Sequence, residues 1–163
     1  METIQDILDL TIKNGAMIIK PADDAKIEKC DRDLRGKGLF HLPGGYVQFL
    51  KLANGYAWNG FEFFGTERCK DDSSDYVLGD IVESNEYIRK RVGLSDEHLV
   101  LGRFDEDIYV YDYGGFSYKA IDRLTSMDAE EFDSFEDLLT STVGLYAGDD
   151  DDDDYEEEYN DEG

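Results

Sequence analysis

The sequence predicts a single α+β domain in which helices pack on one antiparallel sheet. Apolar residues recur three or four positions apart near both ends of the chain, which indicates amphipathic helices. Asn59-Gly60 separates two aromatic runs, which is the signal of a two-residue hairpin turn. Three further apolar runs between residues 99 and 121 are joined by links short enough for antiparallel pairing. Helices combined with such hairpins are typical of the α+β class.

The N-terminal part predicts helices and a loop. Asn14-Gly15 ends the first helix, because Gly readily adopts the left-handed conformation found past a helix end. Residues 21–34 hold few apolar residues and predict a short helix or an irregular connection, and residues 35–40 predict a flexible loop. A further helix includes Pro43 in its first turn and stops at Asn54-Gly55. The apolar faces of the first and last of these helices are Ile4, Ile7, Leu8 and Ile12, and Tyr46, Phe49, Leu50 and Ala53.

The rest of the chain predicts a hairpin, a helix, a meander and a closing helix. The hairpin spans residues 56–65, and a polar loop over residues 71–75 separates it from a helix that runs from Tyr76 to Val92. Three strands then follow, over residues 99–104, 107–113 and 116–121, with Asp105-Glu106 and Gly114-Gly115 as their turns. Ser134 caps the last helix with Asp137 three residues later, and the apolar residues of this helix are Phe135, Leu138, Leu139 and Val143.

The charge of the chain restricts its partners. The sequence has 40 Asp and Glu against 16 Lys and Arg, a formal net charge of −24. The last fifteen residues hold 11 of the acidic residues and no basic one, which leaves 29 acidic against 16 basic residues, or −13, over residues 1–148. A body of this sign repels phosphate backbones and anionic membrane surfaces. We therefore expect no direct nucleic-acid binding and no membrane binding, and we expect a basic protein partner.

Composition also divides the chain. The C-terminal DDDDDDYEEEYNDEG is a like-charge block with little apolar surface to offset chain entropy, so we expect a folded domain over residues 1–147 and a disordered acidic tail over residues 148–163. The N-terminus lacks the basic start and apolar stretch of a signal peptide, and no run reaches the roughly 18 apolar residues of a membrane span. With Cys30 and Cys69 as the only cysteines, a cytoplasmic protein with free thiols is expected.

Three stretches of the sequence resemble the SUKH superfamily. Residues 42–65, LPGGYVQFLKLANGYAWNGFEFFG, are similar to that family's LP-x-x-Y-x-x-F-L helix, its Asn-Gly stop and the aromatic hairpin after it. Residues 99–113, LVLGRFDEDIYVYDY, look like its second landmark, a strand ending in Gly followed by an acidic turn and an aromatic strand. The segment SFEDLL, residues 134–139, is similar to its closing helix. Gly44-Gly45 departs from the charged or polar pair that is usual before Tyr46.

The resemblance implies an α+β domain that acts through protein contacts. Most bacterial members are immunity proteins, which bind and neutralise a cognate polymorphic toxin, commonly a nuclease or a nucleic-acid deaminase. Other relatives are eukaryotic regulators of cell-wall assembly or viral proteins. The family brings no general catalytic motif, and its recurrent residues imply structural roles. In this sequence they are Leu42, Pro43, Tyr46, Phe49, Asn54, Gly55 and Gly102.

The residues that could carry catalysis or bind a metal are few. His41 and His98 are the only histidines, and neither stands in a GxSxG or HExxH context. Cys30 and Cys69 lack the CxxC spacing of a zinc site. We therefore predict no enzymatic activity, no metal and no cofactor. An enzyme would need a pocket that brings one of the histidines to a carboxylate.

The predicted partner-binding residues are one tryptophan and a set of carboxylates. Trp58 lies beside the hairpin turn, where partial exposure would make it available as an interface anchor. Exposed carboxylates would mimic nucleic acid and compete for a basic groove, because complementary charge speeds association. This predicts an immunity protein that occludes the active-site groove of a toxin. The alternative is a non-catalytic scaffold or regulatory domain that docks on cellular proteins. The acidic candidates are Asp71, Asp72, Asp75, Asp80, Asp105, Glu106 and Asp107.

Overall fold

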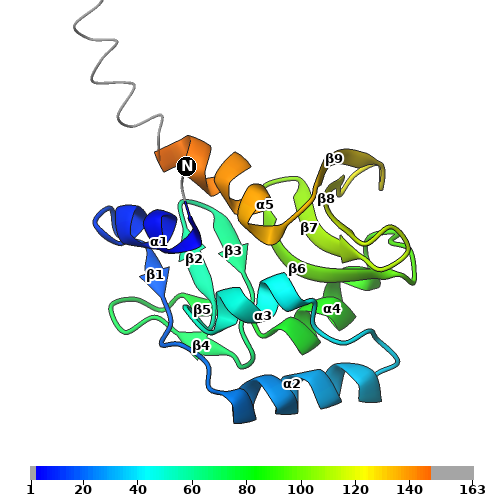
Figure 1. Cartoon of the computed structure of the whole chain (residues 1–163), viewed down its shortest axis with the longest axis horizontal. Coiled ribbons are helices and arrows are strands. Elements are labelled where there is room, and N and C mark those ends of the chain that lie inside the picture. Colours follow the sequence, from blue (N-terminus) through cyan, green and yellow to red (C-terminus); the bar gives the residue numbers. More distant parts are fainter. Residues whose placement is uncertain (1–2, 148–163) are drawn as a thin grey trace, which may run out of the picture.

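Seven strands form one antiparallel sheet (Figure 1). Along the sheet they lie in the order β1 (Met17–Ile18), β2 (Tyr56–Trp58), β3 (Phe61–Phe63), β6 (His98–Phe104), β7 (Asp107–Asp112), β8 (Ser117–Asp122) and β9 (Asp128–Phe132). Strands β4 (Cys69–Lys70) and β5 (Val77–Leu78) pair separately as a small hairpin. The computed structural model describes residues 3–147, so the tail expected over residues 148–163 lies outside the described residues.

Five helices occur within residues 3–147 and pack on this sheet. They are α1 (Ile4–Ile12), α2 (Asp24–Gly36), α3 (Gly44–Leu50), α4 (Ile81–Arg89) and α5 (Phe135–Ser141). In the view of Figure 1, α1, α3 and α5 lie in front of the sheet and α4 lies behind β6. Helix α2 packs against α4. The predicted α+β class, with helices packed on an antiparallel sheet, is confirmed.

Side-chain caps fix where most of the helices begin. A cap satisfies backbone N–H groups that have no partner within the helix. The cap predicted at Ser134 is confirmed, because its hydroxyl accepts a hydrogen bond from the Asp137 N–H at 3.0 Å. Pro43 is the N-cap residue of α3, one position before the helix rather than in its first turn. The side-chain caps of α1, α2, α4 and α5 are Thr3, Asp23, Asp80 and Ser134.

Helix α2 is longer than the sequence indicated. The helix continues through Arg35 and Gly36, which the sequence assigned to a flexible loop. Asp23 accepts a hydrogen bond from the Lys26 N–H (2.9 Å), and the side chain of Lys29 pairs with that of Asp33 at 2.8 Å. These local interactions support a helix whose buried face is narrow. That face consists of Ile27, Cys30 and Leu34.

Helix α4 begins five residues later than predicted. Tyr76 precedes strand β5, Val77 and Leu78 belong to that strand, and Asp80 then caps the helix. The apolar pair at the start of the expected helix therefore pairs with β4 instead. Val92, which the periodicity placed in the same helix, lies beyond its end at Arg89 but is buried all the same.

Strands β1 and β9 form the two edges of the sheet and were not predicted. Strand β1 has two residues, too few to show an alternating pattern. Strand β9 has the sequence DAEEF, whose three acidic residues leave no alternating apolar pattern that would predict a strand. Charged side chains on an edge strand also discourage pairing with other chains.

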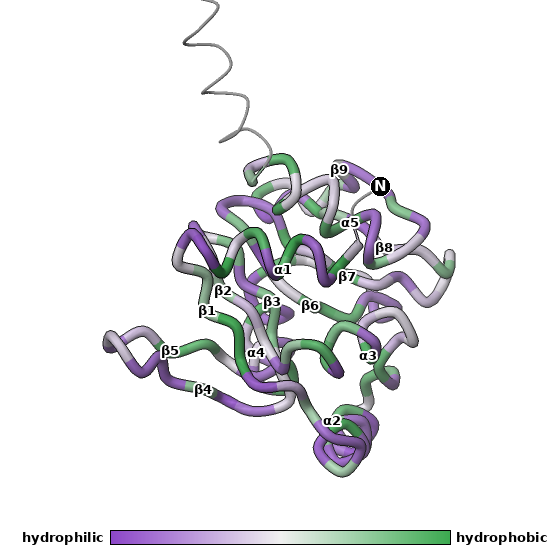
Figure 2. Tube along the Cα trace, turned by 60° about the vertical axis from the view of Figure 1, so that its left-hand side comes forward, coloured by the Kyte–Doolittle hydropathy of each residue, from purple (hydrophilic) through white to green (hydrophobic). Residues whose placement is uncertain are grey.

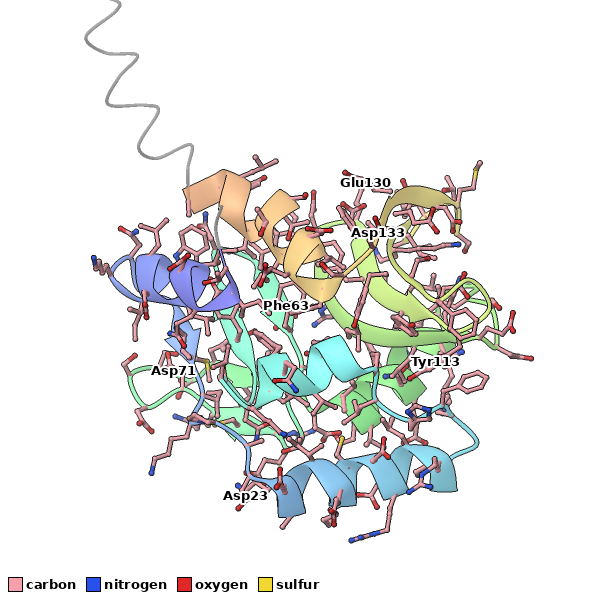
Figure 3. All side chains as sticks on the ribbon, in the orientation of Figure 1. Asp23, Phe63, Asp71, Tyr113, Glu130 and Asp133 are labelled. Atoms are coloured by element: carbon pink, nitrogen blue, oxygen red, sulfur yellow. The ribbon has the colours of Figure 1, made fainter. Side chains whose placement is uncertain are left out.

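The core is built on an aromatic cluster between the sheet and helices α3 and α5. Figure 3 shows Phe63 at the centre of the molecule, facing these helices. Its ring stacks on Tyr109 at 5.4 Å and meets Phe49 and Phe135 edge-on at 6.2 and 5.5 Å. Tyr46 places its hydroxyl 2.5 Å from the carbonyl oxygen of Phe64, which satisfies the polar atom of a fully buried ring.

Two glycines in this core are required by close approach. A Cβ at Gly102 would stand 2.3 Å from the carbonyl oxygen of Glu62 on the neighbouring strand. A Cβ at Gly45 would stand 2.5 Å from the hydroxyl oxygen of Tyr118. The Tyr118 ring thus accounts for Gly45 at a position where the resemblance led us to expect a charged or polar residue.

Candidate partner-binding surface

The predicted acidic residues fall into two separate groups, and the remaining one, Asp80, belongs to neither. Asp71, Asp72 and Asp75 lie in the loop of the β4–β5 hairpin, which projects from the body in Figure 2. Asp105, Glu106 and Asp107 lie at the β6–β7 turn. In Figure 3 the labelled Asp71 lies on the left, and Glu130, a neighbour of the β6–β7 turn, lies at the upper right. The two groups therefore do not form one continuous acidic surface.

In the β4–β5 loop, Asp71 holds the loop together. Its carboxylate accepts hydrogen bonds from the Ser74 hydroxyl (2.9 Å) and from the N–H and hydroxyl of Ser73 (3.4 and 3.1 Å). These bonds, that of Ser74 first, lower the pKa of Asp71. Asp72 and Asp75 are exposed, and Asp75 lies 3.9 Å from the ammonium group of Lys70. Asp72 and Asp75 are the members of this group that remain free for a partner.

Asp80 has a structural role that the sequence did not reveal. Its carboxylate accepts a hydrogen bond from the Glu83 N–H at 2.8 Å, as the N-cap of α4. Its backbone also forms a parallel bridge with Gly65, and the Ile81 N–H donates to the Gly65 carbonyl at 2.9 Å. Asp80 is only partly exposed, so it contributes little to a surface that a partner could contact.

The β6–β7 turn belongs to a larger acidic cluster than predicted, which consists of Asp105, Glu106, Asp107, Asp122 and Glu130. The antiparallel register pairs Asp107 with Asp122 on β8 and pairs Ala120 with Glu130 on β9. Because side chains alternate between the faces of a sheet, Asp107, Asp122 and Glu130 lie on the same face. Sequence reasoning missed Asp122 and Glu130. Pairing the residues outward from the Gly114-Gly115 turn, one on each side, would have placed Asp122 opposite Asp107.

The surroundings of Asp107 in this cluster disfavour its ionised form. Partial burial raises the pKa of Asp107, and the charges of Asp122, Asp105, Glu106 and Glu130 raise it further. A carboxyl group whose pKa is higher in the folded than in the unfolded state favours the folded state only when it is protonated. Stability from Asp107 is therefore gained as the pH falls through its folded pKa and is absent at pH 7.

Replacing Asp107 by Asn should stabilise the protein at pH 7. We expect Asp107→Asn to raise the melting temperature by about 1–2 °C at pH 7, because it removes the repulsion between Asp107 and the neighbouring carboxylates. Near pH 3, where Asp107 is protonated, the substitution should give no gain. Asp71→Asn is the matched control with the opposite sign. It removes a carboxylate that accepts hydrogen bonds, so its melting temperature should fall at pH 7. Thermal unfolding by circular dichroism measures both, and a lower melting temperature for Asp107→Asn would contradict the interpretation.

Trp58 is buried, contrary to the exposure expected from its place beside the hairpin turn. Its side chain is 9 % exposed, and its indole N–H donates to the carbonyl oxygen of Asn14 at 3.2 Å. Asn14 lies just beyond the end of α1 and is distant from Trp58 in sequence. Trp58 therefore offers a partner little surface.

Other aromatic residues are exposed instead, and one of them borders the acidic cluster. Tyr146 is 43 % exposed, and its ring meets that of Phe104 edge-on at 5.4 Å. Phe104 pairs with Asp107 in the β6–β7 register, so Tyr146 lies on the same face as the acidic cluster. Sequence reasoning missed Tyr146 because it follows the last predicted helix. The other exposed aromatic residues within residues 3–147 are Phe40, Tyr76, Tyr87 and Phe116.

The two histidines occupy structural positions. His41 Nδ1 lies 3.2 Å from the carbonyl oxygen of Leu42, and its ring meets Tyr113 edge-on. His98 Nε2 lies 3.9 Å from the carboxylate of Asp112, which the ammonium group of Lys119 also contacts at 2.9 Å. His98 and Asp112 are each 9 % exposed, and burial lowers the pKa of His98. This pairing is the histidine–carboxylate contact that an enzyme would need, but both groups are enclosed by the fold.

The remaining candidate residues are isolated from one another. Cys30 is buried, and burial raises the pKa of its thiol to about 12, whereas Cys69 is partly exposed. Within residues 3–147, no group of three or more His, Cys, Asp or Glu side chains is arranged to hold a metal ion. Among these residues, no helix is long and apolar enough to cross a membrane.

Most of the chain matches a model of a known protein family. A family model described as SUKH_5, SMI1-KNR4 cell-wall, matches residues 1–143. A comparison with curated proteins found no match. The SUKH superfamily includes immunity proteins and SMI1/KNR4 regulators, and its domains generally act through protein–protein contacts. The matched segment covers all five helices and ends shortly after α5, and it contains the LPGGYVQFL helix, the aromatic hairpin and strands β6 and β7. The chain therefore belongs to the SUKH family.

Proposed function

We propose that this chain is an immunity protein that binds a basic toxin domain and occludes its nucleic-acid-binding groove. The acidic cluster around the β6–β7 turn carries the proposal. Five carboxylates gather there, and partial burial, followed by the charges of the other four, raises the pKa of Asp107. A protein keeps a carboxylate whose charge is unfavourable in the folded state when the binding of a partner requires that charge.

Tyr146 supplies the anchor that such a surface needs. Charge complementarity mainly speeds association and excludes wrong partners, whereas buried aromatic side chains supply much of the affinity. The Tyr146 ring is exposed at the border of the acidic cluster, and Leu145 beside it is 60 % exposed. The acidic residues from Asp149 onward begin three positions after Tyr146 in the sequence. We therefore place the centre of the toxin interface at the acidic cluster and Tyr146, with the β4–β5 loop outside it.

The partner is identified by capture from the native cells with the full-length chain. A single stoichiometric partner that is basic, and toxic when expressed alone, is the expected result. A set of acidic or non-toxic partners would overturn the proposal.

Two double charge reversals then test where the toxin binds. Asp105→Lys with Glu106→Lys changes the acidic cluster, and Asp72→Lys with Asp75→Lys makes the same charge change on the exposed β4–β5 loop. At about 0.15 M salt we expect the cluster variant to slow association about tenfold and the loop variant to slow it less than twofold. Stopped-flow or surface-plasmon measurements give the rates. Equal slowing by both variants would show that only net charge acts and would remove the cluster as the interface.

A second function is favoured by the description of the matched family model. That description is SMI1-KNR4 cell-wall, and SMI1/KNR4 proteins are regulators rather than immunity proteins. Under this alternative the chain is a scaffold that docks on several cellular proteins. It predicts several non-toxic partners in the capture experiment and normal growth of cells that lack the gene.

A further inference from the structure

A cavity on the sheet face opposite to the acidic cluster is lined by several basic residues. It has a volume of about 320 Å³ and lies between α4 and the connections that follow β6 and β8. Its floor is apolar, formed by the buried side chains of Ile88, Val92 and Ile108. Three guanidinium groups, those of Arg91, Arg103 and Arg123, line the cavity with a single carboxylate, that of Asp105.

The positive charge in this cavity is only partly neutralised. Arg103 donates from Nε to Glu62 at 2.6 Å. Within residues 3–147, neither Arg91 nor Arg123 has a carboxylate oxygen within 4.0 Å. In a body of net charge −13 over residues 1–148, two arginines that line one cavity without an acidic partner are an exception to the surrounding charge.

Two of the three guanidinium groups are held in place before any ligand binds. The Arg91 guanidinium lies 3.7 Å from the centre of the Tyr87 ring, and its Nη1 donates to the Tyr87 carbonyl oxygen at 3.1 Å. Arg103 is fixed by Glu62, which also accepts a hydrogen bond from the Tyr76 hydroxyl. A side chain that is already ordered loses less conformational entropy on binding.

We propose that this cavity binds a phosphate monoester joined to a planar ring, a ligand of mononucleotide size. Guanidinium groups recognise phosphate through paired hydrogen bonds, and a phosphate monoester offers three oxygens and close to two charges, enough for both Arg91 and Arg123. The volume is at the lower end of the range of small-ligand sites, and the apolar floor and the Tyr87–Leu124 walls suit a ring rather than a sugar alone.

This inference is independent of the toxin-binding proposal. Arg103 pairs with Ile108, and both lie on the sheet face opposite to that of Phe104, Asp107 and Tyr146. Asp105 is the one residue that belongs to both the acidic cluster and the cavity lining, so Arg91→Gln and Arg123→Gln test the cavity without changing any residue of the acidic cluster.

Isothermal titration of the full-length chain tests the site with four probes. They are adenosine 5′-monophosphate, ribose 5-phosphate, adenosine and inorganic phosphate. We expect the nucleotide to bind at least about tenfold more tightly than each of the other three. Equal binding of adenosine would overturn phosphate recognition, and equal binding of ribose 5-phosphate would overturn the ring. No saturation by the nucleotide at about 5 mM would overturn the site.

Single arginine variants locate the binding. Arg91→Gln and Arg123→Gln should each weaken nucleotide binding about tenfold, the effect of losing one charge-assisted hydrogen-bonding group. Arg32→Gln is the matched control, because Arg32 is exposed on α2 and is not among the residues that line the cavity, and it should change binding less than twofold. An equal loss in Arg32→Gln would show that the nucleotide responds to overall charge and would overturn the proposal.

Discussion

Replacing Phe63 by Ala will lower the free energy of unfolding by about 3–5 kcal/mol, the range for deleting a large aromatic side chain from a packed core. Phe63 is fully buried and joins the sheet to helices α3 and α5. Its ring contacts Tyr109 on β7, Phe49 on α3 and Phe135 on α5. The substitution therefore leaves a cavity lined by rings from three elements that cannot all move inward together.

Phe116→Ala is the matched control for this prediction. Phe116 is 76 % exposed in the turn between β7 and β8, so the same truncation removes little buried surface. Its free energy of unfolding should change by less than about 0.5 kcal/mol. Urea unfolding followed by tryptophan fluorescence measures both variants, since Trp58 is buried in the fold. A change below about 1 kcal/mol for Phe63→Ala would mean that the three elements collapse onto the space and that the cluster does not hold the helices to the sheet.

Local signals were sufficient wherever a few adjacent residues determine the backbone. The hairpin at Asn59-Gly60 is confirmed, and both residues adopt positive φ angles, 53° and 95°, as a turn of this kind requires. The cap at Ser134 is confirmed for the same reason, because it depends on one hydroxyl and one N–H three residues later. The helix, hairpin and meander that carry the family resemblance are all of this local type.

Features that depend on distant residues could not be predicted. Trp58 looked exposed because it adjoins a turn, but it is buried, and its indole N–H bonds to the carbonyl of Asn14, more than forty residues away. Val77 and Leu78 fit a helical pattern, yet pairing with Cys69 and Lys70 makes them a strand. The acidic cluster extends to Glu130 only because β9, an unpredicted strand, pairs with β8. Arg91, Arg103 and Arg123 come from three separate segments, so nothing in the sequence joins them.

Asn85 shows the same limit at a single core position, and it gives the second large prediction. It lies on α4 between the apolar residues Ile81 and Ile88 and is fully buried. Its amide nitrogen donates to the Val100 carbonyl (2.9 Å), and its amide oxygen accepts from the Val100 N–H (2.8 Å). Strand β3 pairs with β6 only at Gly102 and Arg103, so Asn85 takes the place of a strand partner farther along β6.

Replacing Asn85 by Leu should lower the free energy of unfolding by about 2–4 kcal/mol. Leu is branched at Cγ as Asn is, but the substitution leaves the N–H and carbonyl of Val100 buried without partners, and each such group costs about 1–3 kcal/mol. Asn14→Leu is the control, because Asn14 is exposed and its side chain makes one hydrogen bond, to the Leu10 carbonyl; its effect should be less than about 0.5 kcal/mol.

Hydrogen exchange separates this explanation from a general loss of packing. If Asn85 substitutes for a strand partner, the Val100 amide in Asn85→Leu should exchange faster under native conditions than the overall loss of stability accounts for. The Val110 amide lies on the neighbouring strand β7 and makes no hydrogen bond to Asn85. Its exchange rate should rise only by the amount that the loss of global stability accounts for. Equal changes at Val100 and Val110 would show that Asn85 fills space in the core and that the edge of β6 needs no side-chain partner.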